Sequence, residues 1–287
     1  MSVSSFHILS KLGDGSFAEV FLAHHLPQNK LYAMKVIRKE VILKRHLINQ
    51  TRSEYDILRQ ISHPFVTKLE FAFQTSNSVV FVMEYCPRGD LFYLIKERNL
   101  TEDQIRFFAA ELVIALEYLH NNKIMHRDIK EENVMIGLDG HIRLGDFGLS
   151  REGIIYPDRG SRDLCGTPEY IAPEMLRENT HGYAVDWWGF GVLLFEMLVH
   201  WYPFYSYDRN RLYAKIRNFP VDVPSTVSSD ASDLLYKLLR KEPTSRLGGV
   251  RDAQEVKEHP FFRTIDWDML ERGKVPAPIV GREEEEE

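Results

Sequence analysis

Two short segments in the middle of the chain carry residue types that could do chemistry on a phosphate group. Residues 126–133 read His-Arg-Asp-Ile-Lys-Glu-Glu-Asn, and Asp146-Phe147-Gly148 begins thirteen residues after Asn133. Phosphoryl transfer needs positioning and charge neutralisation more than covalent chemistry. In the general pattern of such sites, Asp128 orients a hydroxyl nucleophile, while Asn133 and Asp146 hold Mg²⁺ against the phosphates of a nucleotide. The two segments therefore predict a phosphoryl-transfer site.

Two segments nearer the N-terminus could contact the phosphates of the nucleotide. Residues 13–20 read Gly-Asp-Gly-Ser-Phe-Ala-Glu-Val, and glycines between strands let backbone amides approach phosphate oxygens. A plain hairpin turn explains this segment equally well, and Ala18 stands where a third glycine is usual. Lys35 is either an edge-strand charge or a phosphate ligand. Glu54 on the following helical segment favours the ligand, because a Lys–Glu pair fixes such a lysine on the phosphates.

The two central segments also have plainer explanations. They could be loops that carry carboxylates by chance, but five matched positions at fixed spacing make chance improbable. Lys130 could neutralise the transferred phosphoryl group, or it could be a surface lysine. Residues 166–174 read Gly-Thr-Pro-Glu-Tyr-Ile-Ala-Pro-Glu, which at this distance past Asp146 is typical of the end of an activation segment.

Composition bounds the class of protein. The chain has 287 residues, 44% hydrophobic and 27% charged, which is typical of a soluble globular protein of one large domain or two moderate ones. The formal net charge is −6, and the five glutamates 283–287 supply most of it. Without a basic excess, we expect no nucleic-acid partner. The glutamate run itself is interpreted as a solvated end or a cut from a longer acidic segment.

Cysteine content and hydropathy indicate the compartment. Cys86 and Cys165 cannot form a disulfide framework or a zinc site, which favours a reducing environment. The longest apolar stretch, Gly189 to Val199, contains Glu196 and is too short to span a bilayer. The first residues lack the pattern of a signal peptide. We therefore expect a soluble, cytoplasmic protein without a membrane segment.

The order of predicted elements favours an α+β fold with two lobes. Apolar, β-branched runs predict strands at 20–23, 31–37 and 79–84, and helical spacing predicts a helix at 51–60. Thr101-Glu102-Asp103-Gln104 has the form of a capping box before a long helix. Further helices are predicted at 186–198, 208–217 and 230–240. A small, mostly-β lobe at about 1–83, a hinge at 84–88 and a larger, mostly-α lobe at 89–268 would place a nucleotide in the cleft between them.

The chain resembles eukaryotic protein kinases, and within them the AGC group. Four segments carry the AGC resemblance: Leu164 to Tyr170, Val185 to Gly189, Ser245 to Gly249, and His259 to Phe262. The resemblance runs from about Phe6 to Leu270, which implies a catalytic domain at 1–268 and a truncated or short AGC-type tail at 269–287 with an acidic end. Phe261-Phe262-Arg263 with Ile265-Asp266-Trp267 is similar to the protein kinase N and C branch.

The resemblance implies an ATP- and Mg²⁺-dependent protein serine/threonine kinase, with a catalytically weak pseudokinase scaffold as the alternative. Asp128 and Lys130 would be catalytic, and Asn133 and Asp146 would hold metal. Residues from both lobes would bind ATP, with Met83 as gatekeeper: Leu12, Gly13, Gly15, Val20, Ala33, Lys35, Glu54, Met83, Glu84, Cys86, Asp90 and Met135. Other residues would have structural roles. An apolar spine would consist of Leu58, Leu69, His126 and Phe147. Glu174 would form an ion pair with Arg246, and Asp186 would anchor the catalytic loop.

By the same resemblance, Asp90 and Glu132 would bind arginine residues upstream of the substrate serine or threonine. Arginine–carboxylate pairs are directional and charge-assisted. A third acidic position of some relatives is Ala214 here, which favours one basic residue, three before the acceptor, over two. Solvated surface acids remain the plainer explanation. The expected partners are protein substrates with basic residues and regulatory domains or subunits outside this chain.

The activation segment departs from the family pattern at Asp163. Most AGC kinases carry a phosphorylated threonine at this position, two residues before Cys165. Arg127 and Arg151 would form its basic pocket, and Thr167 would lie in the same segment. Aspartate supplies one negative charge and two acceptor oxygens, against a charge of about −1.5 to −2 and three oxygens for a phosphate. We therefore expect a permanent but weaker contact with Arg127.

Overall fold

The computed structural model describes residues 3–15, 17–177 and 180–278. The glutamate run 283–287 and the end of the predicted tail lie outside these residues. The smaller lobe is one antiparallel sheet with the order β1-β2-β3-β5-β4. Its strands are β1 (Phe6–Asp14), β2 (Glu19–His25), β3 (Lys30–Arg38), β4 (Leu69–Gln74) and β5 (Ser78–Glu84).

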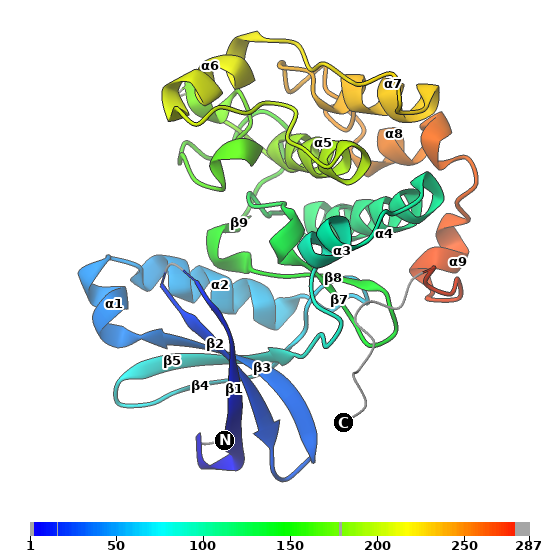
Figure 1. The fold of residues 1–287 in the computed structure, drawn as a ribbon. Helices are drawn as coiled ribbons and strands as arrows, with labels where there is room; N and C mark the ends of the chain where they lie inside the picture. The colour runs from blue at the N-terminus through cyan, green and yellow to red at the C-terminus, as the bar shows by residue number, and fades with distance from the viewer. Residues whose placement is uncertain (1–2, 16, 178–179, 279–287) are drawn as a thin grey trace.

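Two helices follow the central strand β3. The short helix α1 (Lys39–Lys44) projects at the outer end of the lobe, while α2 (Ile48–Gln60) lies between the sheet and the larger lobe (Figure 1). Helix α2 is amphipathic, and it buries Ile57 and Leu58 together with the carboxylate of Glu54. The sheet and α2 thus bring the strand that carries Lys35 against the helix that carries Glu54.

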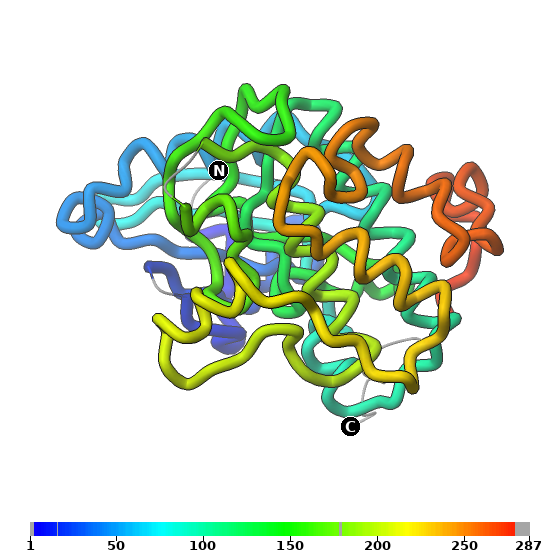
Figure 2. The backbone as a smooth tube through the Cα atoms, turned by 90° about the horizontal axis from the view of Figure 1, so that it is seen from above, coloured from blue at the N-terminus to red at the C-terminus, as the bar shows by residue number. Residues whose placement is uncertain are grey.

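The larger lobe is mostly helical. Its helices are α3 (Leu91–Glu97), α4 (Glu102–Asn121), α5 (Ala184–Val199), α6 (Arg209–Asn218), α7 (Ser229–Leu238), α8 (Ala253–Lys257) and α9 (Trp267–Glu271). Two short antiparallel pairs, β6 (Ile124–Met125) with β9 (Arg151–Glu152) and β7 (Val134–Ile136) with β8 (Ile142–Leu144), face the smaller lobe. From above, the helical lobe lies in front of the sheet, and light-blue α1 projects beyond its edge (Figure 2).

Helices α4 and α5 form the core of this lobe. The predicted capping box is present: Thr101 Oγ1 accepts from Gln104 N, and the Gln104 side chain accepts from Thr101 N. Apart from Asp186 and Glu196, helix α5 is mostly apolar, and it is almost wholly buried, as expected for a central helix. Among the described residues, no helix is long and apolar enough to cross a membrane.

The predicted α+β, two-lobed fold class is confirmed by the sheet and the helical lobe. All predicted strands and helices exist, with ends displaced by a few residues. Strands β1, β4 and β6 to β9 and helices α1, α3, α8 and α9 were not predicted. Strand β1 is an exposed edge strand of mixed polarity, so it lacks the apolar run used to find the others.

Candidate active site

The catalytic loop, residues 126–133, connects β6 to β7 and is held by a residue of α5. Asp186 of that helix accepts hydrogen bonds from the backbone N–H groups of His126 (2.8 Å) and Arg127 (2.7 Å). Arg127 has a φ of +72°, a conformation that non-glycine residues adopt only under tertiary restraint. The contact predicted for Asp186 is therefore present, and it fixes the backbone that leads into Asp128.

The carboxylate of Asp128 is buried and surrounded by hydrogen-bond donors. Its Oδ1 accepts from Thr167 N (3.1 Å) and Thr167 Oγ1 (3.0 Å), and its Oδ2 accepts from Asn133 Nδ2 (3.0 Å). Lys130 Nζ lies 3.4 Å from Oδ2 and donates to Thr167 Oγ1 at 3.1 Å. Burial opposes the charge of Lys130, but Asp128 and Glu132 outweigh it and raise the pKa of the ammonium. The loop thus holds one carboxylate and one cation side by side.

A second cluster joins the two lobes at Lys35. Its ammonium lies 2.6 Å from Glu54 Oε1 and 3.0 Å from Asp146 Oδ1, so the predicted Lys35–Glu54 pair is present. Burial disfavours the ammonium, yet the two carboxylates outweigh burial and raise the pKa of Lys35. The same ammonium holds the pKa of Asp146 below its usual range. Burial raises the pKa of Glu54, because its side chain is only 5% exposed.

The oxygens of Asn133 and Asp146 fit a hard divalent cation. Asn133 uses its amide nitrogen to donate to the backbone oxygen and the carboxylate of Asp128. Within the described residues, no donor contacts its Oδ1 or the second oxygen of Asp146, whose side chain is 52% exposed. No group of three or more acidic, histidine or cysteine residues in that part of the chain could hold a metal alone. Two oxygen ligands completed by phosphates and water are typical of Mg²⁺.

Most of the residues predicted around the nucleotide lie on β1, β2, β3 and β5, while Glu54 lies on α2 and Cys86, Asp90 and Met135 follow β5 in the sequence. Gly13 pairs with Val20 across the β1–β2 turn, and Ala33 pairs with Met83 across β3 and β5. Gly15 N donates to Ala18 O at 2.8 Å, which closes the tip of the loop. Among the other predicted residues, Leu12 precedes this turn on β1, while Met135 lies on β7 and forms an isolated bridge with Asp90.

The hinge residues already use their side chains. The carboxylate of Glu84 pairs with Arg143 at 3.3 Å, so only its backbone remains for a ligand. Cys86 is buried, and burial raises the pKa of its thiol to about 12. A thiol in this state is a small apolar group rather than a nucleophile.

The two residues predicted to bind substrate arginine lie in different settings. Asp90 is the N-cap of α3, and its Oδ1 accepts from Tyr93 N at 2.9 Å. The sequence did not reveal this structural role. Glu132 is 50% exposed, and its carboxylate lies 3.8 Å from Lys130 Nζ. Partial burial and the neighbouring Glu131 raise the pKa of Glu132.

Asp163 sits in the basic pocket predicted for it. Its Oδ2 accepts from Arg151 (2.7 Å), Arg127 (3.2 Å) and the hydroxyl of Ser161 (3.1 Å). Partial burial is outweighed by the hydrogen bonds from Arg127 and Ser161, which lower the pKa of Asp163. Further along the segment, Glu174 forms a bidentate pair with buried Arg246 at 2.7 and 2.8 Å, as predicted.

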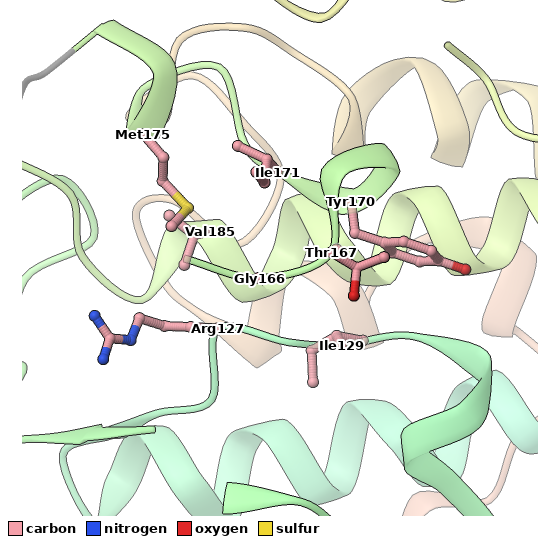
Figure 3. Close-up of a pocket in the computed structure, with 9 residues that line it drawn as sticks. Arg127, Ile129, Gly166, Thr167, Tyr170, Ile171, Met175 and Val185 are labelled. Atoms are coloured by element: carbon pink, nitrogen blue, oxygen red, sulfur yellow. The ribbon is translucent and has the colours of Figure 1, made fainter. Parts of the chain in front are cut away.

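A small cavity separates the catalytic loop from the activation segment. Arg127 and Ile129 lie on one side of it and residues of the segment 166–175 on the other, with Val185 of α5 behind (Figure 3). Its volume of about 10 Å³ is enough for no more than one water molecule. It is therefore a packing gap and not a substrate pocket.

The sequence did not reveal two buried contacts around the site. Gln50 of α2 donates to the backbone oxygen of Gly148, which ties the helix to the segment after Asp146. The hydroxyl of Tyr170 contacts the carboxylates of both Glu131 and Glu196. Burial and Glu131 raise the pKa of Glu196 to about 8. In the sequence, the one indication of this contact between Tyr170 and two glutamates was Glu196, an acidic residue within the apolar stretch 189–199.

Known proteins are similar to this chain in sequence. Residues 6–262 match the protein kinase domain family. The chain is 47% identical to RAC-beta serine/threonine-protein kinase A of Xenopus laevis and 45% identical to the RAC-beta serine/threonine-protein kinase of Homo sapiens, over 97% of its length. It is 42% identical to the RAC family serine/threonine-protein kinase homolog of Dictyostelium discoideum, over 98%.

The chain spans 58% of the two RAC-beta relatives and 63% of the Dictyostelium relative. These relatives carry RAC names, so the similarity does not favour the predicted protein kinase N and C branch. The family match covers both lobes and every segment of the site described above. The chain therefore belongs to the protein kinase family.

Proposed function

We propose that this chain is the catalytic domain of an ATP- and Mg²⁺-dependent protein serine/threonine kinase of the AGC group. The observation that carries the proposal is the contact of Lys35 with both Glu54 and Asp146, at 2.6 and 3.0 Å. This contact joins a strand, a helix and the segment after β8 into one charged cluster. In the kinase pattern, the Lys–Glu pair and the aspartate must both be in place for activity. The RAC-type relatives support the serine/threonine class.

Each residue of the cleft has a proposed part in the reaction. Bound MgATP would supply the transferable phosphoryl group and most of the charge that neutralises it. Lys35 would contact the phosphates, while Asn133 and Asp146 would offer oxygens to the metal. Asp128 would accept the hydrogen bond of the substrate hydroxyl and orient it, and Lys130 would lie beside the transferred group. The catalytic domain would extend over residues 1–268, followed by a tail.

We also propose a substrate with arginine upstream of the acceptor. Asp90 keeps one carboxylate oxygen beyond its capping bond, and the half-exposed Glu132 lies within the catalytic loop. These two carboxylates would favour a cationic side chain over a neutral one. Ala214 still argues against a second basic position.

The test is phosphorylation of a serine/threonine peptide library by the purified chain with MgATP. We expect incorporation of phosphate, enriched in peptides with arginine three residues before the acceptor, and none with Asp128→Asn. An equal rate for arginine and alanine peptides would contradict the substrate proposal alone. A chain that binds ATP without phosphorylating any peptide would be a pseudokinase. Activity on choline or an aminoglycoside would indicate a small-molecule kinase.

A further inference from the structure

A buried histidine outside the cleft faces two carboxylates. His120, in the last turn of α4, has a side chain that is 1% exposed. Its Nδ1 lies 2.8 Å from Asp252 Oδ1, and its Nε2 lies 3.0 Å from Asp186 Oδ2. A carboxylate oxygen can only accept, so both ring nitrogens must donate. The geometry therefore requires an imidazolium cation between two aspartates.

The chain of contacts continues to the catalytic loop. Asp186 is the residue that accepts the backbone N–H groups of His126 and Arg127, and the Oδ2 atom that accepts from His126 also faces His120. The charge of Asp186 is fully buried, and an unpaired buried carboxylate would be protonated or displaced. Together with these two N–H groups, the imidazolium balances the charge of this carboxylate and constrains its orientation.

Asp252, on the other side of His120 from Asp186, is also held in place by its surroundings. Asp252 has a φ of +51° and a ψ of −139°, a backbone conformation rare for a non-glycine residue. The loop before it is held by Glu255, which accepts from Gly248 N and Arg251 N at 2.8 Å each. Trp187 Nε1 donates to Asp252 Oδ1 at 2.7 Å. These contacts hold the carboxylate of Asp252 against His120.

We propose that His120 is a positioning residue for phosphoryl transfer, which acts through Asp186 on the backbone of the catalytic loop and is itself oriented by Asp252. The inference rests on the proposed kinase function, because it concerns the geometry of Asp128. His120 touches neither nucleotide nor substrate. Its removal should lower the rate of the chemical step while leaving the binding of both substrates nearly unchanged.

The charge of His120 gives this role a pH signature. Burial opposes the cation, but Asp252 and Asp186 outweigh burial and raise its pKa to about 9. The groups that face it are Asp186 of α5, Asp252 before α8, and the rings of Tyr183 and Trp187. Tyr183 has a pKa of about 12 and stays neutral. The contribution to stability is therefore complete below the ordinary histidine pKa and is lost as pH rises through about 9.

The experiment compares His120→Gln with His141→Gln as the matched control. His141 is also a histidine paired with a buried carboxylate, that of Glu111, but it packs on Phe65 and Phe107 and contacts no residue of the catalytic loop among the described residues. We expect kcat of His120→Gln to fall about tenfold or more, with both KM values within about twofold. At temperatures where it is folded, the control variant His141→Gln should have the same kcat as the wild type.

The pH profile separates positioning from a loss of stability alone. The kcat of the wild type should fall between pH 8 and 10, partly because His120 loses its proton near pH 9. The His120→Gln variant has no such proton, so its kcat should fall less over this range. Asp252→Asn, which keeps the volume of Asp252, should lower kcat in the same way. The double variant should be no worse than His120→Gln, because both act through one chain of contacts. The proposal would be overturned if folded His120→Gln had the same kcat as the wild type. It would also be overturned if the losses of kcat in His120→Gln and Asp252→Asn were additive in the double variant.

A readout that needs no activity tests the structural part independently. Hydrogen exchange of the amides of His126 and Arg127 should speed up in His120→Gln and Asp252→Asn, but not in His141→Gln. Unchanged exchange in both variants would overturn the positioning role. If wild-type chain phosphorylated no peptide while exchange responded as expected, the kinase proposal would fail and the contact between His120 and the loop would stand.

Discussion

Asp128 and Asp146 are both carboxylates of the cleft, but their neighbours differ. Asp128 is held by Thr167 and Asn133, while Asp146 contacts Lys35 and, in the proposed function, would offer an oxygen to a metal ion. We expect Asp128→Asn and Asp146→Asn each to abolish peptide phosphorylation. Affinity for MgATP should survive in the first variant and fall in the second, which nucleotide titration beside turnover measures. Near-normal turnover of Asp146→Asn would contradict the metal assignment.

Asp163 should make the activation segment independent of an upstream kinase. Two arginines and a serine hydroxyl already contact its carboxylate, which is 57% exposed. An exposed pair contributes only about 0–1 kcal/mol, so the ordered segment should be partly populated. We expect intermediate activity from unphosphorylated wild-type chain and less from Asp163→Ala and Asp163→Thr. Equal turnover of wild type and Asp163→Ala would show that the carboxylate is not the switch.

The same residue predicts a flat pH response. The pKa of Asp163 is lowered in the folded chain, so its stabilising contact is present above the ordinary aspartate pKa and is lost only as pH falls below it. A phosphothreonine, whose second pKa is about 6, would change charge between pH 5 and 7. The ratio of wild-type to Asp163→Ala turnover should therefore stay constant over this range.

Lys241 is a half-buried residue with a buried ammonium group, and its replacement should stabilise the fold. Its Nζ has no hydrogen-bond acceptor among the described residues and lies 3.8 Å from the centre of the Phe204 ring. Burial, with Arg246 and Arg177 nearby, lowers its pKa to about 7. At pH 7 and below, holding this ammonium in the folded state costs free energy. Lys241→Met should raise the free energy of unfolding by on the order of 1 kcal/mol there.

The pH dependence of this effect follows from the lowered pKa. As pH rises from about 7 toward the ordinary lysine pKa, the folded chain already carries a neutral amine, so the penalty shrinks. The difference between Lys241→Met and wild type, measured by urea unfolding, should therefore narrow from pH 7 to pH 10. A difference that widened over this range would mean that the rings stabilise the cation more than burial opposes it.

At the scale of elements, the activation segment is anchored by one buried ion pair. Arg246 donates to both oxygens of Glu174 and to Ala184 O at the start of α5. Removing one partner leaves a buried, uncompensated charge, so Glu174→Gln and Arg246→Met should each lower the free energy of unfolding by about 3–5 kcal/mol. The double variant Glu174→Gln/Arg246→Met should lose less than the sum.

An exposed pair in the same lobe provides the control. Arg251 and Glu258 contact each other at 2.7 Å on the surface after α7. Glu258→Gln should leave thermal unfolding unchanged, because water screens such pairs. If Glu174→Gln were equally silent, the pair with Arg246 would not anchor the segment.

For the whole molecule, we expect that binding of MgATP stabilises both lobes together, because residues of both lobes would contact it. Lys35 and Glu54 belong to the smaller lobe, and Asp146 and Asn133 to the larger one. A ligand that binds only the folded chain stabilises it by about 2.7 kcal/mol at one hundred times its Kd. MgATP should therefore raise Tm by several degrees, and chelation of Mg²⁺ or Asp146→Asn should remove most of the increase. An equal rise for Asp146→Asn would argue that this residue holds no metal.

The fold class and the main charged positions of the cleft follow from patterns that are visible in the sequence. The segments 126–133 and 146–148 carry groups whose spacing is set by local backbone geometry, so they could be recognised without a structure. The capping box at Thr101 and the apolar runs of β3 and β5 are local signals as well. Strand β1 was not predicted, because an exposed edge strand lacks a run of apolar residues.

Which charged groups contact one another depends on how the helices and loops pack. Asp252 and His120 are separated by 132 positions, and neither carries a motif, so their contact with Asp186 depends on how α4, α5 and the loop before α8 pack. The same holds for Tyr170 between Glu131 and Glu196, and for Lys241 over the ring of Phe204. Burial and distance set these pKa values, and both are properties of the packed lobe rather than of any segment.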